Sequence, residues 1–227
     1  MNSEQPVLKA RAIHKAFYNP CVVPILKGVD LTIMRGETLA IMGRSGEGKS
    51  TLLQILGTLE NACSGYLEIA NQTVTSFNKS KIRNKNLAFI FQSFHLLEDY
   101  TALENVLMPA SIARNKISKG SPAYKRACEL LEKVGLNSRM HFNTKLLSGG
   151  EKQRVAIARA LCNDPDIIFA DEPSGNLDKQ TSQYIHELLL SFARNQNKTL
   201  VLVTHDTDLA SMCNRRFRLC EGVLVAE

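Results

Sequence analysis

The sequence predicts an α/β protein with a parallel-sheet core, a small antiparallel β subdomain and an inserted helical subdomain. Three observations favour this class. Short apolar runs alternate with amphipathic helical patterns between residues 38 and 204, which is typical of a parallel sheet with helices on both faces. The first thirty-odd residues carry strand-like patterns. The segment from about 101 to 146 carries only helical patterns, so it interrupts the alternation.

Short apolar runs of strand length predict the buried strands of the core, and longer stretches with apolar residues at helical spacing predict its helices. The predicted strands are TLAIM (38–42), LAFIF (87–91), DIIFA (166–170) and TLVLVT (199–204). The predicted helices are KSTLLQILGTL (49–59), EKQRVAIARAL (151–161) and TSQYIHELLLSFARN (181–195).

Two regions depart from this rhythm. Strands are predicted at LKARAIHKAF and ILKGVDLTI, and turns at Asn19-Pro20 and Pro24. The segment GYLEIANQTV (65–74) is expected to join these strands in an antiparallel sheet. The runs TALENVLMPASIARN and AYKRACELLEKVGL predict helices. Because no Gly/Ser linker or long charge run separates these parts, we predict one domain over residues 1–227, with a helical subdomain at about 93–150.

Composition narrows the class of protein only a little. Lys plus Arg number 28 against 22 for Asp plus Glu, a net charge of +6 that suits nucleic acid, an anionic membrane surface, a phosphate ligand or only a solvated surface. The six cysteines form no C-x-x-C pair, and we expect reduced thiols of a cytosolic protein, with Cys162 buried. The chain shows no apolar signal core and no run of about 18 apolar residues, so we expect neither secretion nor a membrane span.

The stretch GRSGEGKS (43–50) carries the strongest chemical signal. It matches G-x-x-x-x-G-K-[ST], the phosphate-binding P-loop, and it stands between a predicted strand and a predicted helix, as that motif requires. Its backbone N–H groups and the helix N-terminus favour an anion. Lys49 is expected to reach the β- and γ-phosphates of ATP, and the Ser50 hydroxyl to bind Mg²⁺. The predicted nucleotide-binding residues here are Gly43, Arg44, Ser45, Gly46, Glu47, Gly48, Lys49, Ser50 and Thr51.

A second motif, DIIFADEPSG (166–175), runs four apolar residues into two acids. A strand that ends in an acid beside a P-loop is a Walker B motif, in which Asp171 holds the Mg²⁺ shell. Glu172 can polarise the attacking water. On its own such a strand could equally end in two solvated acids.

A third motif, LLSGGEKQRVAIARAL (146–161), places Ser148, Gly149 and Gly150 before a helix, which is a second anion-binding helix N-terminus. One triphosphate does not need two such sites from one chain. With this motif the sequence resembles the ATP-binding cassette (ABC) ATPases, whose signature is L-S-G-G-[EQ]. In that family the signature of one subunit closes over the γ-phosphate in the P-loop of another. The resemblance therefore implies a head-to-tail homodimer with two ATP molecules between its subunits.

The same resemblance, which covers residues 7 to 225, implies further roles. Gln92 in IFQSFHLL corresponds to the Q-loop glutamine, a ligand of Mg²⁺ and water that senses the transport partner. Asp178 in SGNLD corresponds to the D-loop residue at the dimer seam, and His205 to the switch histidine at the γ-phosphate. Phe17 aligns with the aromatic residue that stacks on adenine; Tyr18 is the neighbouring candidate, and packing within the β subdomain is the alternative.

Glu47 departs from the family, which usually has a small residue or Ser at this point of the phosphate loop. A carboxylate here is expected to weaken anion binding unless it points to solvent or is offset by Arg44.

Within the family, the sequence most resembles the ATPases of lipoprotein-releasing systems, to which macrolide-exporter and cell-division ATPases are related. The segments that carry this resemblance are IFQSFHLLEDYTALENVLMP (90–109) and FADEPSGNLD. That resemblance implies integral membrane permease partners and a peripheral position on the cytoplasmic face of the inner membrane. The expected docking surface follows Gln92, with packing inside the helical subdomain as the alternative. Its residues are Ser93, Phe94, His95, Leu96, Leu97 and Tyr100.

Three other functions are weighed against transport. A cell-division or cell-wall ABC ATPase, or an exporter of another substrate, would share every motif. A nucleic-acid-associated ABC ATPase is disfavoured, because the chain has neither a long coiled-coil insertion nor a second cassette, so no nucleic acid is expected. A small-molecule kinase is disfavoured by the signature motif and by Glu172.

Overall fold

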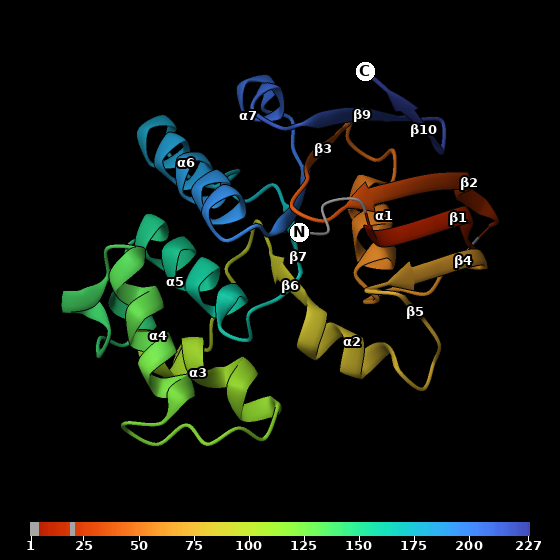
Figure 1. Ribbon diagram of the computed structural model, residues 1–227. Coiled ribbons are helices and arrows are strands. Elements are labelled where there is room, and N and C mark those ends of the chain that lie inside the picture. The colour runs from red at the N-terminus through yellow and green to blue at the C-terminus, as the bar shows by residue number, and fades with distance from the viewer. Residues whose placement is uncertain (1–4, 19–20) are drawn as a thin grey trace.

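A six-stranded sheet forms the core of the protein, in the order β10-β9-β3-β8-β7-β6. A computed structural model describes residues 5–18 and 21–227, and Figure 1 shows how the elements are arranged. Strands β6, β7, β8, β3 and β9 are parallel, and β10 is antiparallel to β9. The bounds of these strands are β3 Thr38–Met42, β6 Leu87–Ile90, β7 Ile167–Asp171, β8 Thr199–Val203, β9 Arg215–Cys220 and β10 Val223–Ala226. The predicted parallel core is confirmed.

A second, antiparallel sheet has the order β2-β1-β4-β5. Its strands are β1 Pro6–Phe17, β2 Val23–Met34, β4 Ser64–Ile69 and β5 Gln72–Thr73. Leu8 pairs with Ile33 of β2 on one side and with Ile69 of β4 on the other, so this sheet joins the two segments as predicted. The predicted turn at Asn19-Pro20 lies outside the described residues. The predicted turn at Pro24 is wrong, because Pro24 lies within β2, where it pairs with Ala16.

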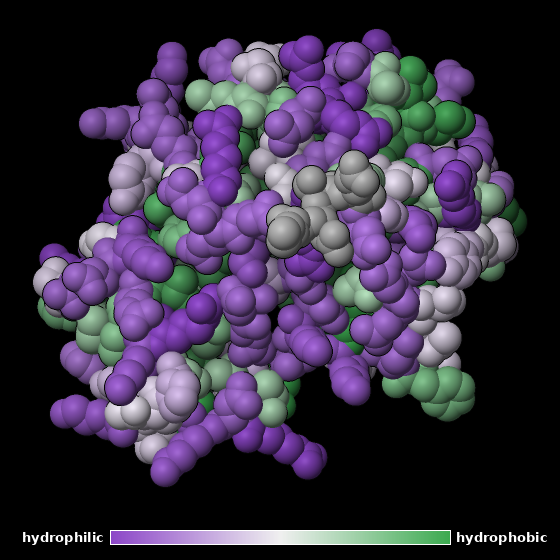
Figure 2. All heavy atoms as spheres, viewed as in Figure 1, coloured by the Kyte–Doolittle hydropathy of each residue, from purple (hydrophilic) through white to green (hydrophobic). Residues whose placement is uncertain are grey.

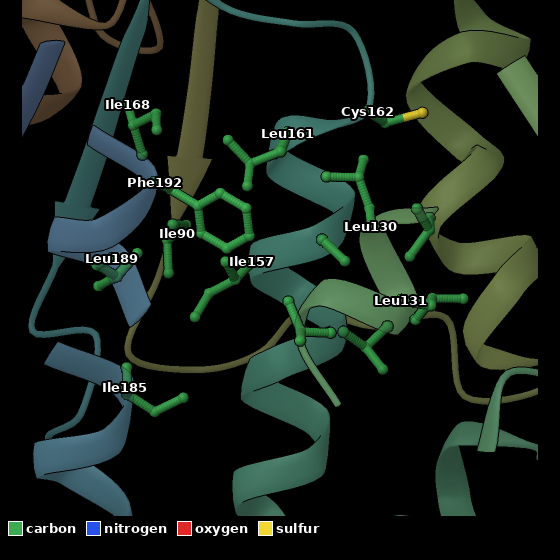
Figure 3. Close-up of a cluster of buried hydrophobic side chains, with 14 of the residues drawn as sticks. Ile90, Leu130, Leu131, Ile157, Leu161, Cys162, Ile168, Ile185, Leu189 and Phe192 are labelled. Carbon is green, nitrogen blue, oxygen red and sulfur yellow. The ribbon is translucent and has the colours of Figure 1, made fainter. Parts of the chain in front are cut away.

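Helices cover both faces of the core sheet, because its strands are buried on both sides. Along β7, Ile167 and Phe169 belong to the core on the α1 side, whereas Ile168 and Ala170 belong to the core on the side of the other large helices. In Figure 3 the second core lies between α6, α5 and the helical subdomain, with Phe192 at its centre. The helices are α1 Lys49–Leu56, α5 Gly149–Leu161 and α6 Lys179–Asn195.

The predicted helical insertion is present between β6 and α5. It contains α3 Ala102–Ile112, α4 Pro122–Lys133, and the short 3-10 turns η1 Asn137–Arg139 and η2 Thr144–Leu146. Thr101 and Glu104 form a capping box that starts α3 at the residue where the apolar pattern begins. Both helices pack against α5, which ties the insertion to the core.

Two α-helices and two strands of the described residues were not predicted from the sequence. They are α2 Lys79–Asn86, α7 Thr207–Ser211, β9 and β10. Helix α2 is strongly polar and buries only Ile82 and Asn86, so it has no apolar stripe to detect. Strand β9 buries Phe217 and Leu219 between arginines, a short alternation that is easily passed over. The cysteines are free thiols, and Cys162 is buried, as predicted.

Helix α1 ends earlier than predicted, at Leu56. A Cβ atom on Gly57 would lie 1.7 Å from the Phe89 ring, so the chain passes too close to β6 for any other residue. Thr58 then takes a left-handed backbone conformation with φ 63°. Among the described residues its buried Oγ1 has no hydrogen-bond partner.

We predict that Thr58→Gly stabilises the fold. A left-handed backbone conformation costs an L-residue roughly 1–2 kcal/mol, and glycine avoids that cost. Against this gain, glycine makes the unfolded chain more flexible, which lowers the free energy of unfolding by about 0.4–1 kcal/mol. Removal of the unpaired hydroxyl adds to the gain, and loss of the buried methyl group offsets it by roughly 0.8 kcal/mol. The free energy of unfolding, measured in urea, should rise by about 1 kcal/mol. Thr75→Gly, at an exposed position absent from the positive-φ set, should lower it instead. A T58G protein less stable than wild type would contradict this account of Thr58.

Candidate functional site

The phosphate loop connects β3 to α1, and its last glycine cannot be replaced. Gly48 stands immediately before α1 with φ 95°, and a Cβ atom on it would lie 2.3 Å from Cγ2 of Ile25. No side chain caps the helix N-terminus. The first backbone N–H groups of α1 therefore remain available to an anion.

Lys49 is buried at the base of this loop. Its ammonium donates to the carbonyl oxygens of Gly43, at 3.0 Å, and of Arg44, at 2.8 Å. Both acceptors are neutral carbonyl oxygens, so neither of them competes as a counter-ion with an incoming anion. This geometry suits the predicted contact with the terminal phosphates of a nucleotide.

The carboxylate of Glu47 turns back onto its own loop. Its Oε2 accepts a hydrogen bond from the backbone N–H of Arg44 at 2.7 Å. It therefore neither points freely to solvent nor pairs with the guanidinium of Arg44, the two possibilities that the sequence suggested. The backbone N–H of Arg44, a donor of the phosphate loop, is therefore already bonded to the Glu47 carboxylate of the same loop.

The carboxyl end of β7 brings Asp171 to Ser50, the first-turn residue of α1. Burial raises the pKa of Asp171, and a hydrogen bond with the Ser50 side chain opposes that rise. Within the described residues, Oδ1 of Asp171 is buried without a hydrogen-bond partner. An unpaired buried carboxylate oxygen next to a hydroxyl is the donor set that a hard cation such as Mg²⁺ takes.

Glu172 and His205 face each other across the ends of β7 and β8. His205 Nε2 lies 3.0 Å from Glu172 Oε1, and the His205 backbone N–H donates to Oε2 at 3.4 Å. Burial raises the pKa of Glu172, while His205 opposes the rise. Glu172 also has φ 44°, an unfavourable backbone conformation of the kind that persists where function requires a fixed side chain. A carboxylate with a raised pKa is suited to general-base chemistry.

Gln92 follows β6 and reaches the segment beyond Glu172. Its side-chain amide donates to Oδ1 of Asn176 at 3.2 Å, and the Asn176 amide donates back to the Gln92 carbonyl at 3.2 Å. This reciprocal pair links the predicted Q-loop to the predicted D-loop segment.

A cavity of about 330 Å³ gathers most of the predicted site. Its predicted members are Ser45, Gly46, Gly48, Lys49, Ser50, Thr51, Gln92, Asp171, Glu172 and His205, and Ile25 and Val203 complete the lining. The sequence did not single out Ile25 or Val203.

The signature segment does not line this cavity. Ser148 caps α5, where its side chain accepts from the Glu151 N–H while the Glu151 side chain accepts from the Ser148 N–H. A Cβ atom on Gly150 would lie 2.7 Å from Thr181 on α6, so the backbones of α5 and α6 approach closely there. Figure 1 shows α5 and α1 on opposite sides of the central strands. Within one chain, the two anion-binding helix N-termini are therefore separate.

Asp178 and Phe17 also lie outside the cavity lining. The Asp178 carboxylate caps α6 by accepting from the N–H groups of Gln180 and Thr181. Phe17 ends β1 with 44% of its surface exposed, and the Lys15 ammonium lies 5.1 Å from its ring centroid. The alternative of packing inside the β subdomain is wrong for Phe17 and for Tyr18, which is still more exposed.

Gln153 links the signature helix to the site, a role that was not predicted from the sequence. It is fully buried in α5. Its amide donates to the Pro173 carbonyl at 2.5 Å and to the Phe91 carbonyl at 3.5 Å, the neighbours of Glu172 and Gln92. A glutamine on an otherwise apolar helix face was the available signal.

We predict that Glu47→Ser binds ATP at least as tightly as the wild-type chain. The change removes a negative charge beside the phosphate loop and frees the Arg44 N–H, which Glu47 otherwise engages, for the anion. Calorimetric titration of ATP measures the effect. Glu129→Ser, an exposed site on α4, makes the same change in net charge and should leave affinity unchanged. A clear loss of affinity in E47S alone would show that the Glu47 carboxylate is needed to shape the loop.

Comparisons with known proteins identify the family of the chain. The family model described as ABC transporter matches residues 26–175. The lipoprotein-releasing system ATP-binding protein LolD of Protochlamydia amoebophila is 63% identical over 96% of each chain, and that of Alcanivorax borkumensis is 42% identical over 99% of each. The ATP-binding cassette MJ0796, solved as a dimer in a post-hydrolysis state bound to ADP and Pi, superposes with a TM-score of 0.88, 38% identity and 97% coverage of each chain. The chain therefore belongs to the ABC transporter family, as an ATP-hydrolysing cassette.

Proposed function

We propose that two copies of this chain, arranged head to tail, hydrolyse ATP to drive a lipoprotein-releasing system. The single observation that carries the catalytic half of this proposal is the pairing of Glu172 with His205 over the phosphate loop, 3.0 Å apart. Glu172 orients the attacking water and accepts its proton, and the imidazole of His205 contacts the γ-phosphate. Lys49 stabilises the charge on the transferring phosphoryl group.

Magnesium fits the residues present. Ser50 and Asp171 would hold it directly, with Gln92 across the cavity, and the buried Oδ1 of Asp171 would then gain the partner it otherwise lacks. When bound there, the ion would supply positive charge to stabilise the terminal phosphates. No cluster of three His, Cys, Asp or Glu side chains occurs in the described residues, as expected where phosphate oxygens and water complete the shell.

A second copy supplies what one chain lacks. Ser148 and the N-terminus of α5 lie apart from the cavity, so they complete the phosphate site only in another subunit. Asp178, exposed at the start of α6, then lies at the seam, and Phe17 is free to stack on adenine. The dimeric form of MJ0796, at 38% identity, supports this arrangement.

The transport role rests on the relatives. Proteins named as lipoprotein-releasing ATP-binding proteins are 63% and 42% identical over nearly the whole chain. Among the described residues, no helix is long and apolar enough to cross a membrane. From the similarity to these relatives, we propose separate integral membrane permeases as partners, and a peripheral position for this chain on the cytoplasmic face of the inner membrane.

The loop after Gln92 presents the proposed docking surface. Asn105, fully buried, holds the backbone of Leu97 by accepting from its N–H at 2.8 Å and donating to its carbonyl at 3.0 Å. With the backbone fixed, the Leu97 and Tyr100 side chains remain 42% and 44% exposed. Phe94 and Leu96 are half-buried, and Leu96 packs against the helical core. The expected docking surface is therefore reduced to its exposed residues, which are Ser93, His95, Leu97 and Tyr100.

We predict that Leu97→Asp abolishes co-purification of the permease while leaving the fold and ATP binding intact, because a charge cannot be buried at an apolar contact without a partner. Tagged chains are extracted in gentle detergent and the associated membrane proteins are identified. Val225→Asp is the matched control, because Val225 is 53% exposed on β10. This strand lies in the hydrophobic area at the upper right of Figure 2, away from the helical subdomain.

Two results would contradict the proposal in different ways. Normal permease recovery with L97D would remove this surface as the docking site. Recovery of a cell-division membrane protein by the wild-type chain would leave the ATPase intact and overturn the lipoprotein role.

A further inference from the structure

Helix α6 has one polar residue on its buried face. The buried residues of this helix are Ile185, His186, Leu189, Leu190, Phe192 and Ala193. An apolar side chain would fill the position of His186 without desolvating an imidazole, so hydrophobic packing does not explain a histidine there. Its hydrogen-bonding partners must supply the reason.

The imidazole of His186 bridges two loops. Its Nε2 lies 2.6 Å from Oγ of Ser174, and its Nδ1 lies 3.9 Å from Oδ2 of Asp206. Burial lowers the pKa of His186, which favours the neutral ring. The negative charge of Asp206 favours a proton on Nδ1, so Nε2 accepts the hydrogen bond and the Ser174 hydroxyl donates it.

Both loops carry a proposed catalytic side chain. Ser174 belongs to the turn after β7, in which the Gly175 N–H donates to the Glu172 carbonyl at 3.0 Å. Asp206 follows His205 and caps α7 by accepting from the Leu209 N–H at 2.9 Å. The same two loops line a second cavity of about 360 Å³ that contains Glu172 and His205. His186 thus lies where a shift of either loop would change the separation of Glu172 and His205.

We propose that His186 is a positioning residue for ATP hydrolysis, which fixes the loop of Glu172 relative to the loop of His205 through its hydrogen bond with Ser174. His186 itself lines neither of the two cavities that contain Glu172 and His205. The inference rests on the proposed roles of Glu172 and His205.

A pair of amide variants tests the bond directly. The side-chain oxygen of glutamine can reach the position of Nε2 and accept from Ser174, whereas that of asparagine reaches only the position of Nδ1. Both variants bury the same amide. With His186→Asn, kcat should fall about tenfold, the worth of one positioned hydrogen bond, while KM for ATP stays unchanged because the phosphate-binding residues are untouched. His186→Gln should restore most of the wild-type kcat.

Ser174→Ala should lower kcat as much as His186→Asn, and the double variant should be no worse than either one, because all three lack the same bond. Glu187→Gln, on the exposed face of the same helix, should match wild type. Equal kcat values in the Asn and Gln variants, or additive losses in the double variant, would overturn the proposal.

Glu172→Gln serves as the reference for the site itself. If E172Q keeps wild-type turnover, the proposed role of Glu172 fails. If E172Q loses turnover while His186→Asn does not, only the role of His186 fails. Amide hydrogen exchange in nucleotide-free protein gives a readout independent of activity. Residues 174–178 should exchange faster in H186N than in H186Q, and equal rates would count against the bridge.

Discussion

The site depends on one constraint, that the parallel strands of the core present their carboxyl ends at the same edge of the sheet. The phosphate loop leaves β3, Gln92 follows β6, Asp171 ends β7, and His205 follows β8. These strands are neighbours in the sheet, in the order β3-β8-β7-β6. Residues far apart in the sequence therefore meet in one cavity without any long-range side-chain interaction having to bring them there.

The same architecture keeps the signature segment away. Helix α5 packs on one face of the sheet, with the helical subdomain, and α1 packs on the other. Within one chain the two anion-binding helix N-termini lie on opposite sides of the sheet, which is why we propose a catalytic unit of two chains. Bound ATP then bridges subunits in the closed state only. A ligand that binds one state better shifts the equilibrium toward it by that difference in affinity, and hydrolysis removes the bridge. In the proposed transport role, closure and reopening would reach the membrane partner through the loop after Gln92.

Sequence predicted the parts of the structure that have a local physical signature. The core strands are continuous apolar runs and the phosphate loop is a spaced glycine pattern, so TLAIM and GRSGEGKS were placed correctly. Helix α2 was missed because its polar sequence has no apolar stripe, and α1 was overextended because the contact of Gly57 with Phe89 is not local.

Polar residues that act through tertiary contacts could not be predicted either. Gln153 and His186 each stand on an apolar helix face, and only the folded chain reveals that they connect the loops of the site. The sequence indicated that Glu47 is unusual in a phosphate loop, but its bond to the Arg44 N–H depends on how the loop folds and could not be predicted.

The most direct test is the mass of the Glu172→Gln chain in solution, measured by analytical ultracentrifugation with MgATP. This variant should bind ATP without hydrolysing it and sediment as a dimer, and as a monomer in ADP. The double variant with Ser148→Arg should be a monomer with ATP still bound. The arginine would block the phosphate site of the other subunit, whereas the phosphate site of the chain that carries it would be unchanged. An E172Q chain that binds ATP yet stays monomeric at every concentration would contradict a site completed by a second copy.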